Sequence, residues 1–246
     1  MTNLAELHSE ECVATPDGKR LYNEVHFTES ARHYDKATAA MSLGQDASWK
    51  RHLIEQLPLA KAPKCLDLAC GTGDLTFALA SHYPQGSIDG IDITQEMLNF
   101  AKLRCKHSNI SFLKNDMAAL DYPDSSMDIV TGGYALRNAP NLEQALAEIY
   151  RVLKPGGTAA FLDFSKPVSP RMQKLEYWTL KLWCSMWGII LHGTPKVHGY
   201  ISVSLRGYPD CQKLDLLYQR VGFTLVHRKR FLFGITEVFL LRKKSS

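Results

Sequence analysis

Residues 65–74 read CLDLACGTGD, a short apolar run that ends in a glycine-rich turn. A helical pattern follows at once, with apolar residues at Leu75, Phe77, Ala78 and Leu79. This order predicts a strand, a tight loop and a helix. Because glycine lacks a Cβ and tolerates positive φ, the backbone of such a loop can approach a nucleotide-like ligand closely.

The same alternation of apolar runs and helical patterns continues along the chain. Alternation of this kind implies right-handed crossovers and a parallel sheet that is covered on both faces. Two further strands near the C-terminus, separated by a short connector that contains glycine, can pair antiparallel and close the sheet. We therefore predict a doubly wound α/β domain with seven strands, mostly parallel with an antiparallel closing strand. The expected strands span residues 64–69, 87–92, 110–114, 127–131, 158–164, 223–228 and 235–241, and the helices span residues 75–82, 95–107, 142–153 and 211–221.

Outside this alternation the chain has three further segments. Residues 1–25 are polar and are predicted to be irregular, and residues 26–57 have a helical pattern. Residues 26–246 are expected to form one domain with a helical insertion near residues 167–200, where three of the four tryptophans lie among other apolar residues at helical spacing. Two interpretations of the insertion are compatible with each other: a helix packed on the core, or the wall of a pocket for an apolar, lipid-tailed substrate.

The composition, 45% hydrophobic and 22% charged over 246 residues, is that of an ordinary globular protein. The net charge of +4 is mild and no segment resembles a nucleic-acid module, so no nucleic-acid partner is expected. The six cysteines form no CxxC pair, which predicts free thiols in a reducing cytoplasm and no metal site. Short basic clusters at residues 228–230 and 242–244 leave peripheral contact with an anionic membrane open. If exposed, Trp178, Trp183 and Trp187 could equally serve a homodimer interface or a membrane contact.

The residues of the glycine loop favour a nucleoside-like ligand without phosphate over a dinucleotide. Residues 71–76 read GTGDLT, without the third glycine of the Gly-x-Gly-x-x-Gly pattern of dinucleotide-binding loops. Asp74, at the start of the helix, would repel a pyrophosphate, which helix N-termini otherwise attract. S-adenosylmethionine carries a sulfonium cation and no phosphate, so acidic residues around the loop suit it. The sequence therefore predicts S-adenosylmethionine as the cofactor.

Two more acids follow at strand ends, where ligands of open α/β sheets bind. Asp92 ends the second expected strand, about twenty residues past the loop, and its carboxylate can accept both ribose hydroxyls. Asp116 follows the third strand and can accept from the adenine amino group, while Met117 can pack on the adenine ring. The alternative for Asp116 is the cap of a turn or helix.

Segments beyond the glycine loop carry a more specific signal. They are ARHYD (residues 31–35), MSLG (41–44), WK (49–50), YALRN (134–138), RVLKPGG (151–157) and LDFSKP (162–167). Together with the loop, these segments resemble the ubiquinone/menaquinone biosynthesis C-methyltransferase family. The resemblance runs from about residue 26 to residue 241 and covers nearly the whole chain.

This resemblance implies a class I methyltransferase fold, a Rossmann-like sheet that uses S-adenosylmethionine without a metal, and methylation of a ring carbon on a prenylated quinol. It implies Tyr34, Arg137 and Asn138 near the reacting ring, with Arg137 polarising a hydroxyl next to the attacking carbon. Because arginine stays protonated, stabilising a phenolate is its natural role, and a structural salt bridge is its alternative. The residues implied to line the cofactor are Asp67, Gly71, Thr72, Gly73, Asp92, Ile93, Asp116, Met117 and Gly133.

Three positions depart from the family pattern, which usually has glycine at Ala135, glutamate at Asp163 and a polar residue at Gly133. These departures leave the acceptor open. A related enzyme of specialised metabolism would act on another small phenolic or polyketide-like molecule, and a further alternative is a relative that binds the cofactor without transferring its methyl group. His192 and His198 are alternative bases, since the pKa of histidine lies near neutrality.

Overall fold

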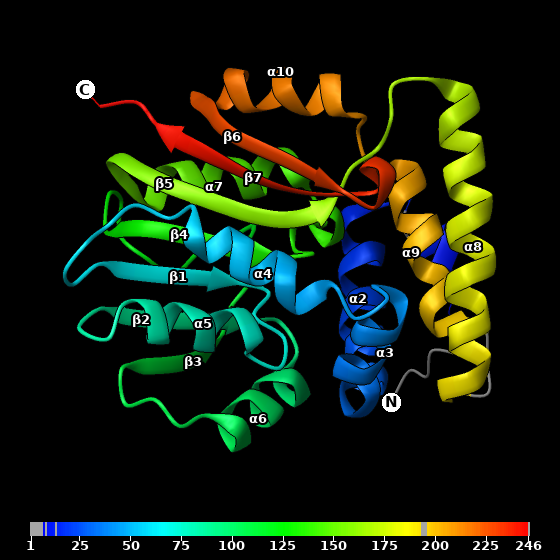
Figure 1. Ribbon diagram of the computed structural model, residues 1–246, viewed down its shortest axis with the longest axis horizontal. Coiled ribbons are helices and arrows are strands. Elements are labelled where there is room, and N and C mark those ends of the chain that lie inside the picture. Colours follow the sequence, from blue (N-terminus) through cyan, green and yellow to red (C-terminus); the bar gives the residue numbers. More distant parts are fainter. Residues whose placement is uncertain (1–6, 8, 13, 193–195, 246) are drawn as a thin grey trace.

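The computed structural model describes residues 7, 9–12, 14–192 and 196–245. Its strands are β1 (Lys64–Leu68), β2 (Ser87–Asp92), β3 (Ile110–Lys114), β4 (Met127–Gly133), β5 (Leu153–Phe164), β6 (Phe223–Phe231) and β7 (Thr236–Lys243). They form one sheet in the order β3-β2-β1-β4-β5-β7-β6 (Figure 1). β7 pairs antiparallel with β5 and β6, and the other strand pairs of this sheet are parallel. The predicted doubly wound, mostly parallel sheet with an antiparallel closing strand is confirmed.

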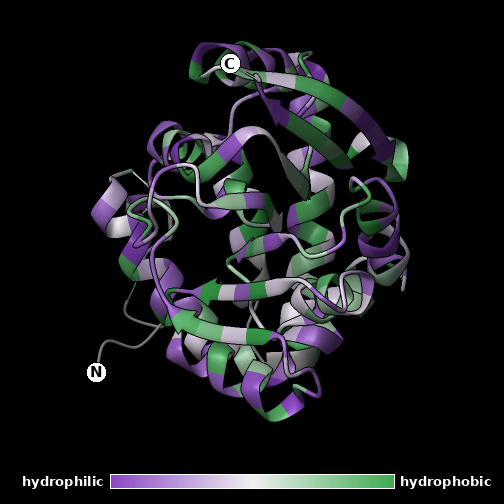
Figure 2. Cartoon of the chain, turned by 90° about the vertical axis from the view of Figure 1, so that its left-hand side faces the viewer, coloured by the Kyte–Doolittle hydropathy of each residue, from purple (hydrophilic) through white to green (hydrophobic). Residues whose placement is uncertain are grey.

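Helices cover both faces of the sheet. They include α4 (Asp46–Glu55), α5 (Asp74–His82), α6 (Gln95–Arg104), α7 (Leu142–Val152) and α10 (Cys211–Val221). Successive residues of a strand point to opposite faces, so Phe161 of β5 packs in a core with α7 and α10, and Leu162 packs in a second core with α4 and α5. Hydrophobic and hydrophilic residues alternate along the helices (Figure 2), as expected for elements that bury one side.

The loop between β1 and α5 takes the tight conformation that its glycines predict. Gly71 and Gly73 have φ angles of +54° and +94°. A Cβ on Gly73 would lie 2.7 Å from Cζ of Phe77, so this position needs glycine for space as well as for conformation. The N–H of Cys70 donates to the carbonyl oxygen of Ile91 at 2.9 Å, which ties the loop to the neighbouring strand β2.

The N-terminal region contains helices α1 (Ser9–Cys12) and α2 (Pro16–Ser30). The expectation of an irregular segment over residues 1–25 is therefore wrong for residues 9–12 and 16–25. Sequence periodicity missed α2 because most of the side chains that it buries are polar, so its inward face has no apolar repeat. Those buried residues are Tyr22, Asn23, His26 and Ser30.

The helical region expected over residues 26–57 is divided. After α2 come a 3-10 turn, η2 (Ala31–His33), and helix α3 (Tyr34–Met41), and only then α4. Leu43 and Gly44, with φ angles of +54° and +74°, reverse the chain between α3 and α4. This break lets α3 lie across the ends of the strands while α4 packs on the sheet (Figure 1).

The predicted helical insertion consists of α8 (Pro170–His192) and α9 (Lys196–Gly207). In Figure 1 these two helices lie with α2 and α3 on the right, the side toward which the parallel strands point. Two further 3-10 turns, η3 (Leu136–Asn138) and η4 (Leu232–Gly234), lie after β4 and between β6 and β7. Within the described part of the chain, no helix is both long enough and apolar enough to traverse a lipid bilayer.

Candidate active site

Two cavities meet beyond the carboxyl ends of the parallel strands, where open α/β sheets bind ligands. The larger, here called the apolar cavity, has a volume of about 310 Å³. The smaller, here called the loop cavity, has a volume of about 50 Å³ and lies against the glycine loop. Phe27, Tyr34, Tyr134 and Asn138 line both cavities. Two cavities that share a wall in this way can hold a cofactor beside an acceptor.

Most of the residues predicted to line the cofactor lie on the loop cavity. Asp92 lies on its wall, where one carboxylate oxygen accepts from the N–H of Gly71 and the other from the N–H of Thr94, both at 2.9 Å. Burial raises the pKa of Asp92, and the backbone N–H groups act in the opposite direction. The predicted residues on this wall are Gly71, Asp92, Ile93, Asp116, Met117 and Gly133.

Asp116 makes the contact of a turn cap and also lies on the wall of the loop cavity. Its Oδ1 accepts from the N–H of Ala118 at 2.9 Å, which is the turn cap that the sequence left as an alternative. Its Oδ2 lies 3.4 Å from Nε of Arg20, an exposed side chain of α2. The same carboxylate lines the loop cavity. An ionised carboxylate has about four lone-pair sites, so these contacts leave capacity for a ligand.

The other three predicted cofactor residues, Asp67, Thr72 and Gly73, are not part of the described wall of the loop cavity. Asp67 is fully buried beneath the loop. There its carboxylate accepts from the hydroxyls of Thr76 at 2.6 Å and Thr131 at 2.7 Å. Asp67 therefore supports the loop from below, by joining α5 to β4.

We expect Asp67→Asn to flatten the pH dependence of stability. Burial raises the pKa of Asp67 from 3.8 to about 6, although the two threonine hydroxyls act to lower it. The folded protein then keeps a proton that the unfolded chain has already lost, so this carboxyl group destabilises the fold as pH rises from about 4 to about 6. The loss is about 3 kcal/mol of unfolding free energy.

Urea denaturation across this pH range measures the effect. The decline should be shallower in Asp67→Asn than in the wild type, and the exposed Asp121→Asn serves as the control. Parallel declines in the wild type and Asp67→Asn would contradict the assignment.

The residues of the loop cavity fit S-adenosylmethionine. Its described lining has two carboxylates, Asp92 and Asp116, and no lysine or arginine, which suits a sulfonium cation and disfavours a pyrophosphate. Ile93, Met97 and Met117 offer apolar surface for a purine ring. This composition agrees with the cofactor that the glycine loop predicts.

Helix α2 closes the loop cavity in this conformation. A volume of about 50 Å³ is far below the roughly 300–1,000 Å³ of ordinary ligand pockets, and Asn23 and Phe27 of α2 lie on the wall. Asn23 donates to the carbonyl oxygen of Asn138 at 2.7 Å. The ion pair between Lys114 and Glu24 also holds α2, but such exposed pairs contribute little. In this conformation α2 therefore covers the loop cavity and leaves it smaller than a nucleoside-sized ligand needs.

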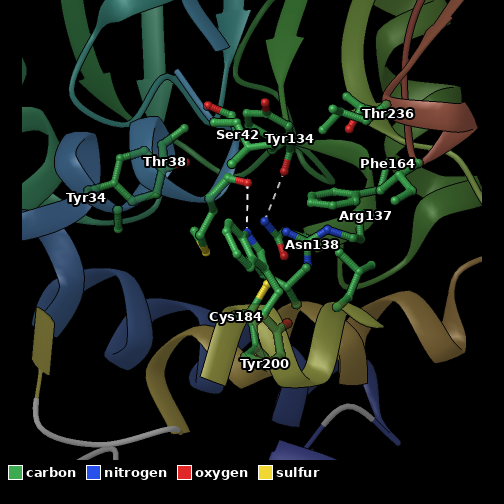
Figure 3. A pocket seen from close by; sticks show the side chains of 18 of the residues that line it. Tyr34, Thr38, Ser42, Tyr134, Arg137, Asn138, Phe164, Cys184, Tyr200 and Thr236 are labelled. Atoms are coloured by element: carbon green, nitrogen blue, oxygen red, sulfur yellow. Dashed lines mark hydrogen bonds between the residues drawn. The ribbon is translucent and has the colours of Figure 1, made fainter. Parts of the chain in front are cut away.

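The apolar cavity is enclosed from three sides (Figure 3). Side chains at the sheet edge form one wall, the α3 segment forms a second, and α8 and α9 form the third. The labelled members are Tyr134, Arg137, Asn138, Phe164 and Thr236 at the sheet edge, Tyr34, Thr38 and Ser42 from the α3 segment, and Cys184 and Tyr200 from α8 and α9.

Arg137 is a buried cation on the wall of the apolar cavity. Its Nη1 donates to the hydroxyl of Ser204, and its guanidinium carbon lies 5.0 Å from the ring centroid of Phe164. Its Nε is buried and has no hydrogen-bond partner among the residues that the structure describes. Asp163 accepts from the backbone N–H of Arg137 at 3.1 Å and so holds the main chain of this segment. Among the described residues the guanidinium forms no ion pair, so the predicted salt-bridge alternative finds no partner there.

Asn138 and Tyr34 lie at the junction of the two cavities. The amide of Asn138 donates to the carbonyl oxygen of Tyr134 at 3.0 Å, while its Oδ1 is buried and finds no partner in the described part of the chain. Burial raises the pKa of Tyr34 to about 12, so its hydroxyl stays protonated near neutral pH. The junction therefore offers unpartnered polar atoms to a ligand. The side chains of the alternative bases, His192 and His198, lie outside the described part of the chain.

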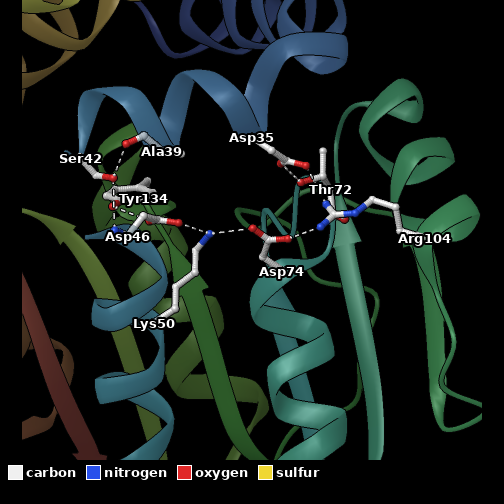
Figure 4. Close-up of polar contacts among 9 residues, drawn as sticks. All are labelled: Asp35, Ala39, Ser42, Asp46, Lys50, Thr72, Asp74, Arg104 and Tyr134. Carbon is white, nitrogen blue, oxygen red and sulfur yellow. Dashed lines mark hydrogen bonds and ion pairs between the residues drawn. The ribbon is translucent and has the colours of Figure 1, made fainter. Parts of the chain in front are cut away.

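A chain of polar contacts that the sequence analysis missed runs from Tyr134, which lines both cavities, to the glycine loop (Figure 4). The hydroxyl of Tyr134 donates to Asp46 at 2.8 Å, and Lys50 bridges Asp46 at 2.7 Å and Asp74 at 3.3 Å. Arg104 continues the chain from Asp74, at 2.6 Å, to Asp35, at 2.9 Å. Asp35 in turn accepts from the hydroxyl of Thr72 in the glycine loop at 2.5 Å. The sequence analysis had named several members of this chain separately, in the YD, WK and YALRN segments and in the glycine loop, but not their contacts with one another.

We expect Lys50→Met to destabilise the fold by about 2–4 kcal/mol, because it leaves the buried Asp46 without a counter-ion. Burial acts to lower the pKa of Lys50, but Asp46 and Asp74 outweigh it and hold the pKa above its usual value. A matched control is Lys154→Met, which breaks a more exposed 2.7 Å pair with Asp128. The control should cost less than about 1 kcal/mol in urea denaturation. Equal losses would contradict a special role for Lys50.

Comparison with known proteins agrees with this geometry. The profile of the ubiE/COQ5 methyltransferase family matches residues 17–243. The demethylmenaquinone methyltransferase of Lactiplantibacillus plantarum is 33% identical over 213 residues, 85% of this chain and 90% of the relative. That of Symbiobacterium thermophilum is 33% identical over 240 residues, 94% of this chain and 96% of the relative.

A crystal structure of an S-adenosylmethionine-dependent methyltransferase from Aquifex aeolicus has the same fold, with a TM-score of 0.59 at 16% identity. It covers 84% of this chain and 97% of that chain. The family profile and the two relatives each span more than four-fifths of the chain, including the glycine loop and the sheet edge. The chain therefore belongs to the ubiE/COQ5 methyltransferase family and is an S-adenosylmethionine-dependent methyltransferase.

Proposed function

We propose that this methyltransferase transfers a methyl group to a ring carbon of a prenylated quinol, in the manner of a demethylmenaquinone methyltransferase. The observation that carries the proposal is an apolar cavity with one buried, unpaired cation, Arg137, beside a cavity that suits S-adenosylmethionine. An apolar wall suits a quinol with a prenyl tail. The cation suits the oxygen of the ring.

Within the loop cavity we assign the ribose hydroxyls to Asp92 and the adenine amino group to Asp116. Ile93 and Met117 would then pack against the adenine ring, and the main chain at Gly71 would run close to the cofactor. These placements rest on the walls of the cavity and on the position of each residue at a strand end. When bound, S-adenosylmethionine supplies an electrophilic methyl group on a sulfonium sulfur.

The protein must make a ring carbon nucleophilic, because a neutral ring attacks poorly. Arg137 would stabilise the phenolate form of the neighbouring hydroxyl, which pushes electron density onto that carbon. The cavity has few competing polar groups, so a buried guanidinium acts there in a low dielectric. The hydroxyl proton would pass to water before transfer, since the guanidinium is not a base. The new bond from the ring carbon to the methyl group would replace the bond from that methyl group to sulfur. The hydrogen on the ring carbon would then leave to water as a proton and the ring oxygen would regain a proton, which restores the aromatic quinol.

Holding the acceptor ring in place beside the methyl donor would supply the rest of the rate enhancement. The unpartnered Oδ1 of Asn138 can accept from the second ring hydroxyl, and the protonated Tyr34 can donate to a ring oxygen. Both residues line the two cavities, so they can hold the acceptor carbon in line with the methyl donor. Such near-attack geometry contributes several kcal/mol in well-oriented systems, on the order of 7–11 kcal/mol at best.

Mass-spectrometric turnover tests the proposal. Purified protein is incubated with S-adenosylmethionine and reduced demethylquinols with short or long prenyl tails, with simple phenols as controls. A product one methylene heavier that forms only from the quinols supports the proposal. Turnover of simple phenols alone would support the specialised-metabolite alternative. Cofactor binding without any product would support the alternative that does not transfer methyl.

A further inference from the structure

Helix α8 presents an apolar face to the outside of the molecule. It is the outermost element on the right of Figure 1. Residues three, four and seven apart share one side of a helix, and on this side Leu175, Leu182 and Ile189 are 61%, 70% and 56% exposed. Leu180 and Cys184 on the opposite side are buried. The members of this face, here called the α8 face, are Met172, Leu175, Trp178, Leu182, Met186, Ile189 and Ile190.

The α8 face differs from the scattered apolar residues that every protein exposes. Leu59 and Leu103 are also exposed, but they lie far apart in the fold, before β1 and in α6. The α8 face instead runs over about five helical turns without interruption by an acidic residue. Contiguous apolar surface of this kind marks a site of contact with another molecule or with a membrane.

The wall of the apolar cavity leads directly into the α8 face. Thr179 lines the cavity and lies four residues after Leu175 and three before Leu182, so it shares their side of the helix. Leu43 and Phe233 also line the cavity and are themselves exposed, which makes its mouth apolar. The prenyl tail of an acceptor bound in this cavity, whose volume is about 310 Å³, would therefore leave through the mouth and remain in contact with apolar surface.

The charges around the α8 face are cationic. Arg171 and Lys174 are exposed, and Nζ of Lys181 lies 5.2 Å from the ring centroid of Trp178. Within the described part of the chain, none of these three cations forms an ion pair. The one acid of α8, Glu176, is buried on the inward side. Lysine and arginine beside tryptophan and leucine are typical of helices that lie in the headgroup region of a bilayer.

We infer that the α8 face docks on the surface of an anionic lipid bilayer, with the mouth of the apolar cavity toward the lipid. The inference deepens the proposed function, since it supplies the route by which a prenyl-tailed acceptor enters. The cations would meet anionic headgroups, which attract them. A symmetric contact between two copies through this face would instead bring the same cations together, and like charges in an interface are unfavourable.

Vesicle co-sedimentation of the full chain tests the inference without any acceptor. Wild-type protein should bind vesicles of phosphatidylcholine mixed with phosphatidylglycerol, and should bind pure phosphatidylcholine much less. The variant L175Q/L182Q should lose at least about tenfold in partitioning, because it removes two leucines from the lipid contact. The control L59Q/L103Q removes two leucines of similar exposure elsewhere and should bind as the wild type does. The variant R171Q/K174Q should lose the preference for anionic vesicles.

Separate readouts distinguish this inference from the proposed function. Calorimetric binding of S-adenosylmethionine and turnover of a detergent-solubilised acceptor should be unchanged in L175Q/L182Q. Failure of the wild type to bind anionic vesicles would overturn the docking inference, whether or not the enzyme turns over a quinol. A wild-type dimer in solution that L175Q/L182Q converts to monomer would also overturn it, and would assign the face to a second copy.

Discussion

Replacing Arg137 with lysine should lower kcat on a quinol acceptor by about 100-fold or more, while the Kd for S-adenosylmethionine changes by less than about twofold. Arg137 is buried on the apolar cavity with an unpartnered Nε. Lysine keeps the charge, but its compact ammonium cannot reproduce the planar guanidinium that reaches Ser204 and leaves Nε free. Single-turnover kinetics and calorimetry measure the two quantities separately.

The pH profile distinguishes a catalytic Arg137 from a structural one. If the guanidinium lowers the pKa of the bound phenol, weaker stabilisation in Arg137→Lys moves the rise of kcat to higher pH. Ser204→Ala is the milder control, because it removes one hydrogen-bond acceptor and keeps the guanidinium. It should cost roughly 3–10-fold in kcat. A collapse of cofactor affinity in Arg137→Lys would instead assign Arg137 to the cofactor site or to the fold.

Asp92→Ala should weaken S-adenosylmethionine binding by about 1–3 kcal/mol, which raises the Kd by roughly 5–150-fold. The carboxylate is the acceptor for the N–H groups of Gly71 and Thr94, and in the proposed function its remaining lone pairs accept from the ribose. Alanine removes both the ligand contact and the anchor of the loop. Asp92→Asn should also lose affinity, since its amide would place a donor against one of the two N–H groups.

Calorimetry and urea denaturation separate the two contributions of Asp92. The loss of unfolding free energy without cofactor reports the anchor of the loop, and any further loss with cofactor present reports the ligand contact. Asp121→Ala, at an exposed position after β3, should leave both quantities unchanged. An unaltered Kd in Asp92→Ala would refute the ribose assignment.

Strands bounded by clear polar breaks were predictable from local pattern alone. β2 and β3 have the bounds that the sequence predicts, Ser87–Asp92 and Ile110–Lys114. β6 instead continues to Phe231, because Lys229 and Arg230 pair with residues of β7. Hydropathy does not report such pairing, since the polar side chains of these residues are partly exposed.

The wall of the loop cavity was more predictable from the order of the strands than the contacts of Asp67 were. Asp92 and Asp116 follow strands, so topology alone brings them to one edge. Asp67 lies within β1, two residues before the loop begins, and its side chain turns into the interior toward Thr76 and Thr131. The position of Asp67 close to the loop in the sequence therefore did not reveal which groups its carboxylate contacts.

Local rules determined the sheet, the glycine loop and the acids at strand ends, because backbone conformation and hydrophobic period depend on near neighbours in the sequence. Tertiary structure alone decided which contacts hold the segment of Arg137. Lys19 of α2 donates to the carbonyl oxygens of Arg137 and Ala139, about 120 positions away, at 2.9 and 2.8 Å. Contacts between residues so far apart in the sequence depend on how whole helices and strands pack. Burial of polar side chains also produces no hydrophobic periodicity that the sequence could reveal. The cover that α2 places over the loop cavity and the contact of the Arg137 guanidinium with Ser204 therefore emerge only in the folded chain.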